Sequence, residues 1–333
     1  MRFGTAEARV GARSRGVVEV GRTASGLPIQ IPLTVVAGRR DGPTLLVAAA
    51  VHGEEVVGSL AIGRVLRELD PADLRGILVA APVVNTSAFE FAQRHTYWDQ
   101  RDLNRVGAGR PDGSVTERLA HRYIIEVIRR VDFMVDIHCG PPHSYMYYTI
   151  FNADLEGVGA DVVAKSRAMA LAYGLEQVFA RTPWRGTLKE VALRAGVPSI
   201  TPEHGGGADF YRGGRDQVAG CVRGITNVMR HLEMLPGRPQ SETGRAVLWD
   251  AHTEIVAGST GGMYLREAWP GDRLEAGDVF GVLYDPYTGE ELERITTPRA
   301  GTVLNTGVVW PVVRPTQWLG LVGDRLEEVD LGF

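Results

Sequence analysis

Short apolar runs alternate with amphipathic stretches over the first two thirds of the chain. Six runs are short, apolar and bounded by turn residues, which predicts strands at 29–36, 44–51, 77–84, 133–138, 145–151 and 197–201. Apolar residues at three- and four-residue spacing predict helices at 55–69, 115–130, 156–173 and 188–195, with a last long helix from about 215 to 235. This alternation predicts an α/β fold around a mixed, largely parallel sheet flanked by helices.

Capping residues mark the ends of two of these helices. Ser114 with Glu117, and Thr187 with Glu190, have the spacing of a capping box, in which each side chain satisfies a free backbone N–H of the other. Gly196, followed by Val-Pro, is typical of a helix end. We therefore expect helices to start at 115 and 188, and the second to stop before Gly196.

The pattern changes near residue 236. The segment 235–244 is rich in proline, glycine and polar residues, and beyond it short β-type runs are separated by glycine turns. We expect a catalytic domain over 1–236 and a smaller all-β domain over 245–333.

Composition narrows the class of protein. A chain of 333 residues with 44% apolar content can bury a large core, and its net charge of −4 offers no basic excess for nucleic acid or an anionic membrane. The longest apolar run, 45–51, is far below the ~20 residues of a membrane helix, and residues 1–21 lack an apolar signal segment. Two cysteines are too few for a disulfide framework. We expect a cytoplasmic protein that acts on small molecules, with homo-oligomerisation left open.

Candidate chemistry begins directly after the second strand. His52 and Glu55 follow this strand in the motif His-Gly-Glu-Glu, and their three-residue spacing brings both side chains to one side where the strand passes into a helix. Gly53 would permit a tight backbone turn there. Ligands of open α/β sheets bind at the carboxyl ends of the strands, so this is a plausible place for a site.

A second histidine completes a set of three possible metal ligands. His138 ends the apolar strand 133–138, again at its carboxyl end. Two imidazoles and one carboxylate match a catalytic zinc site that leaves a fourth position for water. Asp136, two residues earlier, could orient the histidine.

The stretch from Asn85 to Arg105 has an unusual density of polar and arginine residues. It contains Asn85, Arg94 and the box Arg-Asp-Leu-Asn-Arg at 101–105. Guanidinium groups near a metal can clamp a carboxylate or polarise a carbonyl. We interpret this stretch as a substrate-recognition loop, in which Asn85 is one candidate contact.

A carboxylate follows the sixth strand. Glu203 precedes His-Gly-Gly-Gly, which predicts a flexible glycine segment beside it. A glutamate that does not bind the metal can take a proton from water and return it to a leaving amine. We therefore expect Glu203 to be the general base.

Four motifs in this order, His-Gly-x-Glu, Asp-Leu-Asn-Arg, Asp-x-His and Glu-x-Gly-Gly, resemble those of the succinylglutamate desuccinylase/aspartoacylase family of zinc carboxypeptidase-like deacylases. The resemblance spans residues 52–207. It implies a zinc-dependent amidohydrolase that removes an acyl group from a small N-acyl amino acid, with one zinc ion per chain. The residue roles it implies are zinc binding by His52, Glu55 and His138, carbonyl polarisation by Arg94, binding of the substrate carboxylate by Asn104 and Arg105, and proton transfer by Glu203.

Some positions depart from the family pattern. Thr86 follows Asn85 where the family often has proline, Val-Gly-Ala-Gly follows Arg105, and Cys139 follows the metal-binding histidine. These departures affect the expected substrate rather than the metal.

The segment 261–321 resembles the family's small β domain, which has a biotinyl/lipoyl-like hairpin shape. A carrier function is not expected, since no lysine follows Lys189. By this resemblance the domain would wall the active site, and Tyr287 is a candidate substrate contact.

Two other functions fit the same residues. A metallocarboxypeptidase acting on small peptides would share the metal ligands and the base. A zinc-binding module without catalysis would bind the metal without turnover, although the presence of Glu203 counts against it.

Overall fold

The computed structural model describes residues 1–140, 146–181, 184–307 and 312–333. Contacts divide the chain into two compact units. The first contains Met1–Val178, Trp184–Ala246 and Asp330–Phe333, and the second contains Val247–Val329 with a short segment that begins at Phe179. The chain therefore enters the second unit at 247, close to the linker expected from the sequence. The assignment of a catalytic domain to 1–236 and an all-β domain to 245–333 stays a prediction.

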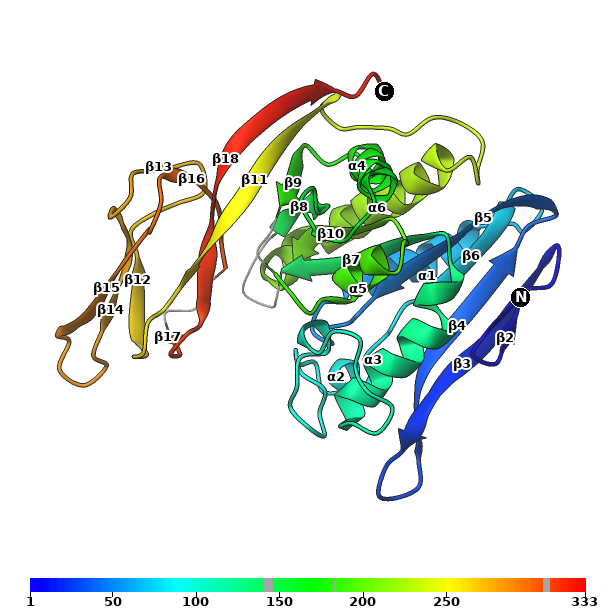
Figure 1. The fold of residues 1–333 in the computed structure, drawn as a ribbon, viewed down its shortest axis with the longest axis horizontal. Coiled ribbons are helices and arrows are strands. Elements are labelled where there is room, and N and C mark those ends of the chain that lie inside the picture. Colours follow the sequence, from blue (N-terminus) through cyan, green and yellow to red (C-terminus); the bar gives the residue numbers. More distant parts are fainter. Residues whose placement is uncertain (141–145, 182–183, 308–311) are drawn as a thin grey trace. The chain divides into compact units, whose positions relative to one another are not determined.

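A mixed sheet flanked by helices forms the first unit, as the sequence predicts (Figure 1). Its strands run in the order β8-β10-β7-β5-β6-β4-β3. The pairs β5–β6, β5–β7 and β7–β10 are parallel, while the outer pairs β3–β4, β4–β6 and β8–β10 are antiparallel. Its strands are β3 (Ala12–Arg22), β4 (Pro28–Ala37), β5 (Arg40–Ala49), β6 (Arg75–Ala81), β7 (Phe133–Gly140), β8 (Met146–Ile150) and β10 (Ser199–Gly206). Strands β1 (Arg2–Phe3) and β2 (Ala6–Glu7) pair as a separate antiparallel sheet, and β9 (Gln177–Arg181) crosses the border of the units.

Helices cover both faces of this sheet (Figure 1). On one face α6 contacts both α1 and α4, and on the other α3 contacts α5. A Cβ at Gly58 of α1 would lie 2.8 Å from side-chain atoms of both Ala49 and Ile137, so the glycine lets α1 approach the sheet closely. The helices are α1 (Val57–Glu68), α2 (Thr86–Glu90), α3 (Val115–Glu126), α4 (Ala160–Tyr173), α5 (Leu188–Arg194) and α6 (Gly207–His231), with short 3₁₀ turns at Leu103–Arg105 and Ile128–Arg130.

The predicted helix ends are largely confirmed. Ser114 and Glu117 form the full capping box of α3, and the Thr187 hydroxyl accepts from the Glu190 N–H at the start of α5. Gly196 follows α5 with a left-handed φ of 82°. In the described residues no helix combines the length and apolar character needed to cross a membrane.

Three boundaries near the site differ from the prediction. α1 begins at Val57, so His52 and Glu55 lie in a turn and not on the helix. β10 continues to Gly206 instead of stopping at residue 201, which places Glu203 inside a strand. α6 begins at Gly207, where the glycine run had predicted a flexible segment. Of the glycines at 205–207, only Gly207 lies in the helix, while Gly205 and Gly206 belong to β10.

The second unit consists of two sheets, in the orders β15-β14-β12-β17 and β13-β16-β18-β11. Buried residues from both sheets, among them Ile255, Phe280, Leu283 and Leu319, form its core. Its strands are β11 (Arg245–Val256), β12 (Gly262–Arg266), β13 (Arg273–Leu274), β14 (Val279–Tyr284), β15 (Glu291–Thr296), β16 (Gly301–Thr306), β17 (Val312–Val313) and β18 (Trp318–Asp330), of which β11 and β18 extend past the unit's borders.

Candidate metal centre and active site

A tight turn after β5 carries the first two candidate ligands. Ala50 has a left-handed φ of 50°, which is unusual for a residue with a Cβ and indicates local strain. The Glu55 N–H donates to the His52 carbonyl at 3.2 Å and closes the turn. At Gly53 a Cβ would overlap the backbone of Ala88, so only glycine lets this turn pack against the start of α2.

The three candidate ligands converge at the carboxyl ends of β5 and β7. Donor atoms of His52, Glu55 and His138 all lie within 4.8 Å of one another, and the three side chains are buried. The Glu55 carboxylate lies between the rings, with Oε1 2.7 Å from His52 Nδ1 and Oε2 2.7 Å from His138 Nδ1. β5 and β7 are parallel neighbours, so their carboxyl ends bring the histidines together although 86 residues separate them in sequence.

The charges of this cluster reinforce one another. Burial alone would raise the pKa of Glu55, but His52 and His138 hold it well below its usual range. Burial works against a charged His138, yet Glu55 and Asp136 raise its pKa well above the usual value. The site therefore concentrates a carboxylate and two imidazole nitrogens in a buried space, which is the nitrogen and oxygen donor set that suits zinc.

Asp102 connects the first histidine to Arg94. Its Oδ1 lies 3.1 Å from His52 Nε2, and its Oδ2 accepts from Arg94 Nε at 3.0 Å and pairs with Nη2 at 2.9 Å. Burial opposes its charge, but His52 and Arg94 hold the pKa of Asp102 well below its usual range. If His52 held a metal ion through Nδ1, its proton would lie on Nε2, and Asp102 Oδ1 would accept the hydrogen bond from that proton.

Arg94 lies beside the candidate ligands Glu55 and His52. Its Nη1 is 3.7 Å from Glu55 Oε1 and 3.4 Å from His52 Nδ1. Burial lowers the pKa of Arg94, but the charge of the neighbouring Asp102 raises it by more. The net effect is a raised pKa, so the guanidinium stays charged. About a third of the Arg94 side chain is exposed.

Asp136 and Asn104 surround the second histidine. Asp136 Oδ2 lies 3.4 Å from His138 Nε2, which is the orienting contact that the sequence suggested. Asn104 Nδ2 lies 3.3 Å from the same ring nitrogen, while its Oδ1 accepts from the Leu188 N–H at 2.8 Å. Only the Nδ2 group of Asn104 is therefore available to a substrate, and its predicted carboxylate contact stays a prediction.

Glu203 lies on β10 in register with His138 on β7. Its side chain is buried, and desolvation, helped by the charge of Glu55, raises its pKa to about 7 against the opposing effects of His138, His52 and Arg94. A carboxyl group with a pKa near neutrality can both accept and return a proton at physiological pH.

Lys189 is a buried neighbour of Glu203 that the sequence analysis gave no role at the site. It is 4% exposed in the first turn of α5, and burial lowers its pKa to about 7 despite the charges of Asp136 and Glu203. A helical repeat places it on the same face as Ala192 and Leu193, which are buried, and this spacing was the available signal.

The remaining predicted residues lie in different environments. Asn85 is fully buried and caps α2, because its Oδ1 accepts from the Ala88 N–H and its Nδ2 donates to Thr96. Arg105 is exposed, and its Nη1 donates to the Asn104 carbonyl at 2.8 Å. Tyr287 belongs to the second unit, at the β14–β15 turn, and is 95% exposed. Substrate contacts by these residues stay predictions.

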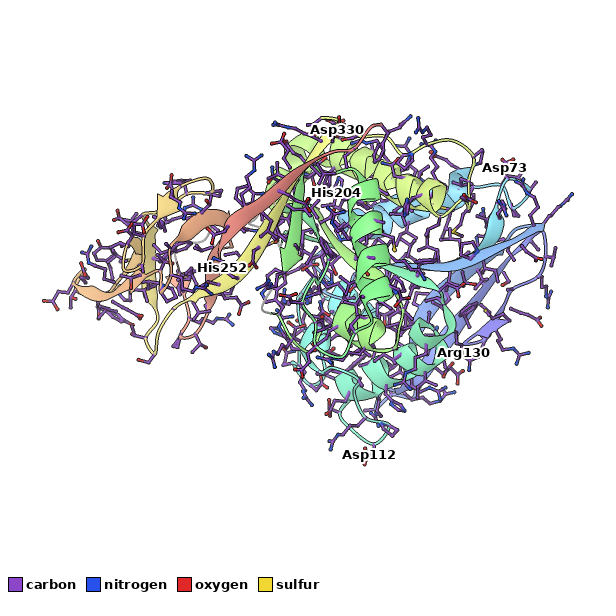
Figure 2. All side chains as sticks on the ribbon, turned by 45° about the horizontal axis from the view of Figure 1, so that its top comes forward. Asp73, Asp112, Arg130, His204, His252 and Asp330 are labelled. Carbon is purple, nitrogen blue, oxygen red and sulfur yellow. The ribbon has the colours of Figure 1, made fainter. Side chains whose placement is uncertain are left out.

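Cys139, which follows the candidate ligand His138, and His204, which follows Glu203, have no role in the proposed chemistry. Burial, with the charge of Glu55, raises the pKa of the Cys139 thiol, so it stays protonated and packs in the core. His204, labelled in Figure 2, lies on β10 against α4 and α6, with Nδ1 3.1 Å from the Tyr173 hydroxyl. Burial lowers its pKa to about 3, so it is neutral.

Asp102 contacts both His52 and Arg94, but the sequence pointed to it only as part of the box at 101–105. Its fixed position two residues before Asn104 was the available signal. The first 3₁₀ turn explains the geometry, because the Asp102 carboxylate also accepts from the Asn104 N–H at 2.8 Å and caps this turn.

A sequence model of the succinylglutamate desuccinylase/aspartoacylase catalytic domain matches residues 41–232, which is more than half of the chain and includes every residue of the cluster. The chain belongs to this family. The match covers the turn after β5, the loop with Asp102, and strands β7 and β10.

Individual relatives extend the similarity over nearly the whole chain. An N-alpha-acetyl-L-2,4-diaminobutyric acid deacetylase from Halomonas elongata is 29% identical over 260 residues, which cover 77% of this chain and 75% of the relative. A crystal structure of succinylglutamate desuccinylase/aspartoacylase from Rhodobacter sphaeroides has a TM-score of 0.81 at 26% identity, covering 98% of this chain and 100% of that one. The ectoine utilization protein EutE (DoeB) from Ruegeria pomeroyi shares the fold, with a TM-score of 0.81 at 23% identity and coverage of 97% and 100%.

Proposed function

We propose that this protein is a zinc-dependent hydrolase that removes the acyl group from a small N-acyl amino acid. The observation that carries the proposal is the convergence of His52, Glu55 and His138 with Glu203 on the adjacent strand. Family membership and the deacetylase relative support a hydrolase of N-acyl amino acids.

The chemistry of the donor set fits a zinc ion. His52 and His138 would bind through Nδ1 and Glu55 through its carboxylate, and the Nε2 atoms would be held by Asp102 and Asp136. When bound, zinc supplies Lewis acidity that lowers the pKa of water and polarises a carbonyl oxygen.

Glu203 and Arg94 supply the remaining steps. The Glu203 carboxylate accepts a proton from the attacking water and, with a pKa of about 7, returns it to the nitrogen of the leaving amine. The Arg94 guanidinium, which Asp102 holds beside the ligands, donates hydrogen bonds to the carbonyl oxygen as negative charge develops there. Asn104 Nδ2 and Arg105 would position the substrate carboxylate.

A substrate panel tests the proposal. Zinc-loaded protein is incubated with N-acetyl, N-succinyl and N-formyl amino acids, including N-alpha-acetyl-2,4-diaminobutyrate, and with dipeptides. Glu203→Gln serves as the matched control, because it keeps the shape of the side chain without its basicity. Metal content is measured in parallel.

We expect turnover of acyl amino acids by the wild type and its loss in Glu203→Gln, with one zinc ion retained by both. Cleavage of dipeptides alone would replace the proposal with a carboxypeptidase. Stoichiometric zinc without turnover of any compound would point to a binding module instead.

A further inference from the structure

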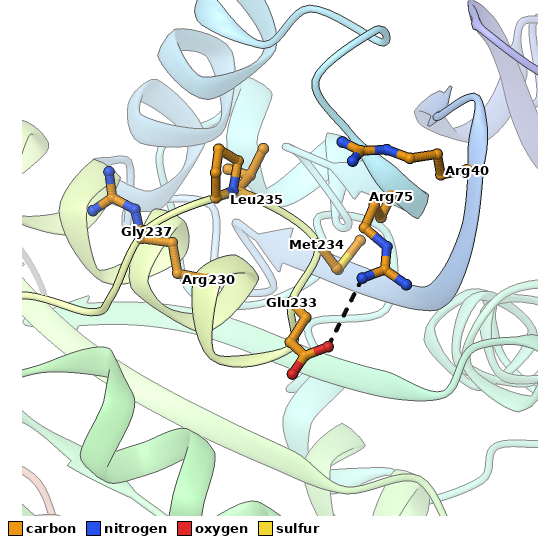
Figure 3. A pocket seen from close by; sticks show the side chains of 8 residues that line it. Arg40, Arg75, Arg230, Glu233, Met234, Leu235 and Gly237 are labelled. Carbon is orange, nitrogen blue, oxygen red and sulfur yellow. Dashed lines mark ion pairs between the residues drawn. The ribbon is translucent and has the colours of Figure 1, made fainter.

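Lys189 differs from the other cations of this chain in its burial. Of the lysine and arginine side chains that the structure describes, only this one is buried, with 4% of it exposed. Arginines elsewhere reach water, as at the start of β6, where Arg75 is 45% exposed and directed toward Glu233, their closest atoms 3.8 Å apart (Figure 3). An exposed pair of this kind contributes little to stability, whereas a buried amine is costly to desolvate. A buried lysine therefore calls for a physical reason.

Strand alternation fixes which face of the sheet Lys189 approaches. On β7, Ile137 packs against α1, so the side chains of Asp136 and His138 point to the other face. On β10, Glu203 is in register with His138 and points to the same side. α5, which carries Lys189 in its first turn, contacts both strands. The lysine is thus buried on the face of the sheet that holds the candidate ligand of β7 and the candidate base.

Polar groups on this face lack hydrogen-bond partners among the described residues. Asp136 directs Oδ2 toward His138 Nε2, while its Oδ1 is buried and unpaired. The hydroxyl of Tyr123, on α3 beside α5, is also buried and unpaired. The amino group of Lys189 likewise has no hydrogen bond or ion pair in the part of the chain that the structure describes. Buried polar groups are normally satisfied, so these unpaired groups reduce stability.

The electrostatics agree with this placement. Burial raises the pKa of the Tyr123 hydroxyl, and the charge of Asp136 adds to the rise. The charges of Asp136 and Glu203 also raise the pKa of Lys189, against the larger opposing effect of burial. Polar groups that lie beyond direct hydrogen-bond distance are commonly bridged by water, and a buried water needs about three polar partners, which this cluster supplies.

We propose that Lys189 is a positioning residue of the hydrolytic site, whose N–H donors hold the Asp136 and Glu203 carboxylates through bridging water. Asp136 in turn orients His138, and Glu203 is the proposed base, so the inference rests on the proposed function. An amine has N–H donors whether it is protonated or neutral. A lysine that costs stability is then explained by the site it supports, since proteins depart from the most stable arrangement at functional sites.

The chain's two lysines provide a matched test. Lys189→Met keeps the length of the side chain and removes its N–H donors, whereas Lys189→Gln keeps N–H donors without the charge. Lys165→Met makes the same change at a lysine of α4 that is 58% exposed. Zinc affinity by competition with a chelator, kcat and KM in saturating zinc, and urea unfolding are measured at pH 8. The amine of Lys189 is mostly neutral at that pH, because its pKa is about 7, so the comparison reports hydrogen bonding rather than charge.

We expect Lys189→Met to fold, to bind zinc about tenfold more weakly and to lose about tenfold or more in kcat, with KM nearly unchanged. The size follows from the usual effect of losing a group that supports a metal ligand, and the constant KM from the absence of a substrate contact. Lys189→Gln should lie between Lys189→Met and the wild type. Lys165→Met should match the wild type in every measurement.

Wild-type zinc affinity and kcat in Lys189→Met would overturn the proposal. Equal losses in Lys189→Met and Lys189→Gln would overturn it too, because N–H donors would then have no effect. A raised KM with unchanged kcat would make Lys189 a substrate contact instead, and loss of the fold in both variants would make it purely structural. The zinc measurement involves no turnover, so a wild type without hydrolase activity would count against the proposed function while the zinc affinities still test Lys189.

Discussion

Asp102→Asn is the substitution that most directly tests how the metal centre is organised. The Asp102 carboxylate contacts His52 Nε2 at 3.1 Å and Arg94 at 2.9–3.0 Å, and it accepts from the Asn104 N–H at 2.8 Å. Asparagine has the same shape but replaces one acceptor oxygen by an NH₂ donor. Whichever way its amide turns, that NH₂ faces either the Nε2–H of His52 or the guanidinium of Arg94.

The size of the effect follows from these contacts. If the amide NH₂ faces His52, the ring loses the acceptor that fixes its tautomer, and loss of such an orienting partner typically weakens metal affinity about 10–100-fold, or roughly 1.4–2.7 kcal/mol. If it faces Arg94, a charge-assisted hydrogen bond worth about 1.5–3 kcal/mol is lost and the guanidinium is released from its position. We expect both zinc affinity and kcat/KM to fall in this variant.

Zinc affinity is measured by competition with a chromogenic chelator, and kcat/KM with the substrate found in the panel. Asp99→Asn is a matched control, because Asp99 lies in the same loop and loses the same charge, but bonds Thr116 rather than a ligand. The control should keep the zinc affinity of the wild type. Wild-type zinc affinity and kcat/KM in Asp102→Asn would refute the assigned role of Asp102.

Three other substitutions test different parts of the structure. Glu203→Gln should lower kcat about 10²–10⁴-fold. In the wild type, kcat/KM should rise with pH through an inflection near 7, because Glu203 must lose its proton to act as a base and its pKa is raised to about 7. A pH-independent rate between 5 and 9 would contradict that. Lys189→Met should stabilise the fold by about 1–4 kcal/mol at pH 7 in urea titrations. The pKa of Lys189 falls from 10.5 to about 7 on folding. The free-energy cost of burying this lysine is therefore largest below pH 7, declines as the pH rises from 7 to 10.5, and vanishes above 10.5, where the amine is neutral in both states. The gain in the variant should therefore shrink as pH rises from 7 to 10.5, and a variant less stable than the wild type would show that Lys189 is held by favourable contacts. Gly53→Ala should cost about 1–3 kcal/mol of stability and weaken zinc binding, because its Cβ overlaps the backbone of Ala88 and Phe89; unchanged thermal unfolding would show that the turn can relax.

The central strands and the convergence of His52, Glu55 and His138 were predictable because their signals are local. β5 and β7 are apolar runs buried on both faces, and His52 and His138 follow or end them directly. Parallel pairing of neighbouring strands then brings their carboxyl ends together, so a sequence pattern was enough to predict a shared site.

Other features depend on contacts that no local pattern contains. β3 is an exposed edge strand rich in arginine and glycine, and its partner β4 rather than its own apolar content holds it in the sheet. The glycine run at 205–207 predicted a flexible segment, but β10 and α6 meet there without a loop. The hydrogen bond from the Leu188 N–H to Asn104 Oδ1 likewise depends on packing between segments 84 residues apart.

The distribution of the candidate metal ligands along the chain has a consequence for folding kinetics in the presence of zinc. Two ligands lie in one turn, three residues apart, while His138 comes 83 residues after Glu55 and reaches them only when β7 pairs with β5. An unfolded chain can therefore offer an ion two donors but not the third. We expect zinc to leave the refolding rate nearly unchanged and to slow unfolding, as an interaction that is completed only after the transition state does. Stopped-flow refolding and unfolding with and without zinc would measure both rates, and faster refolding in zinc would place β5–β7 pairing in the folding nucleus.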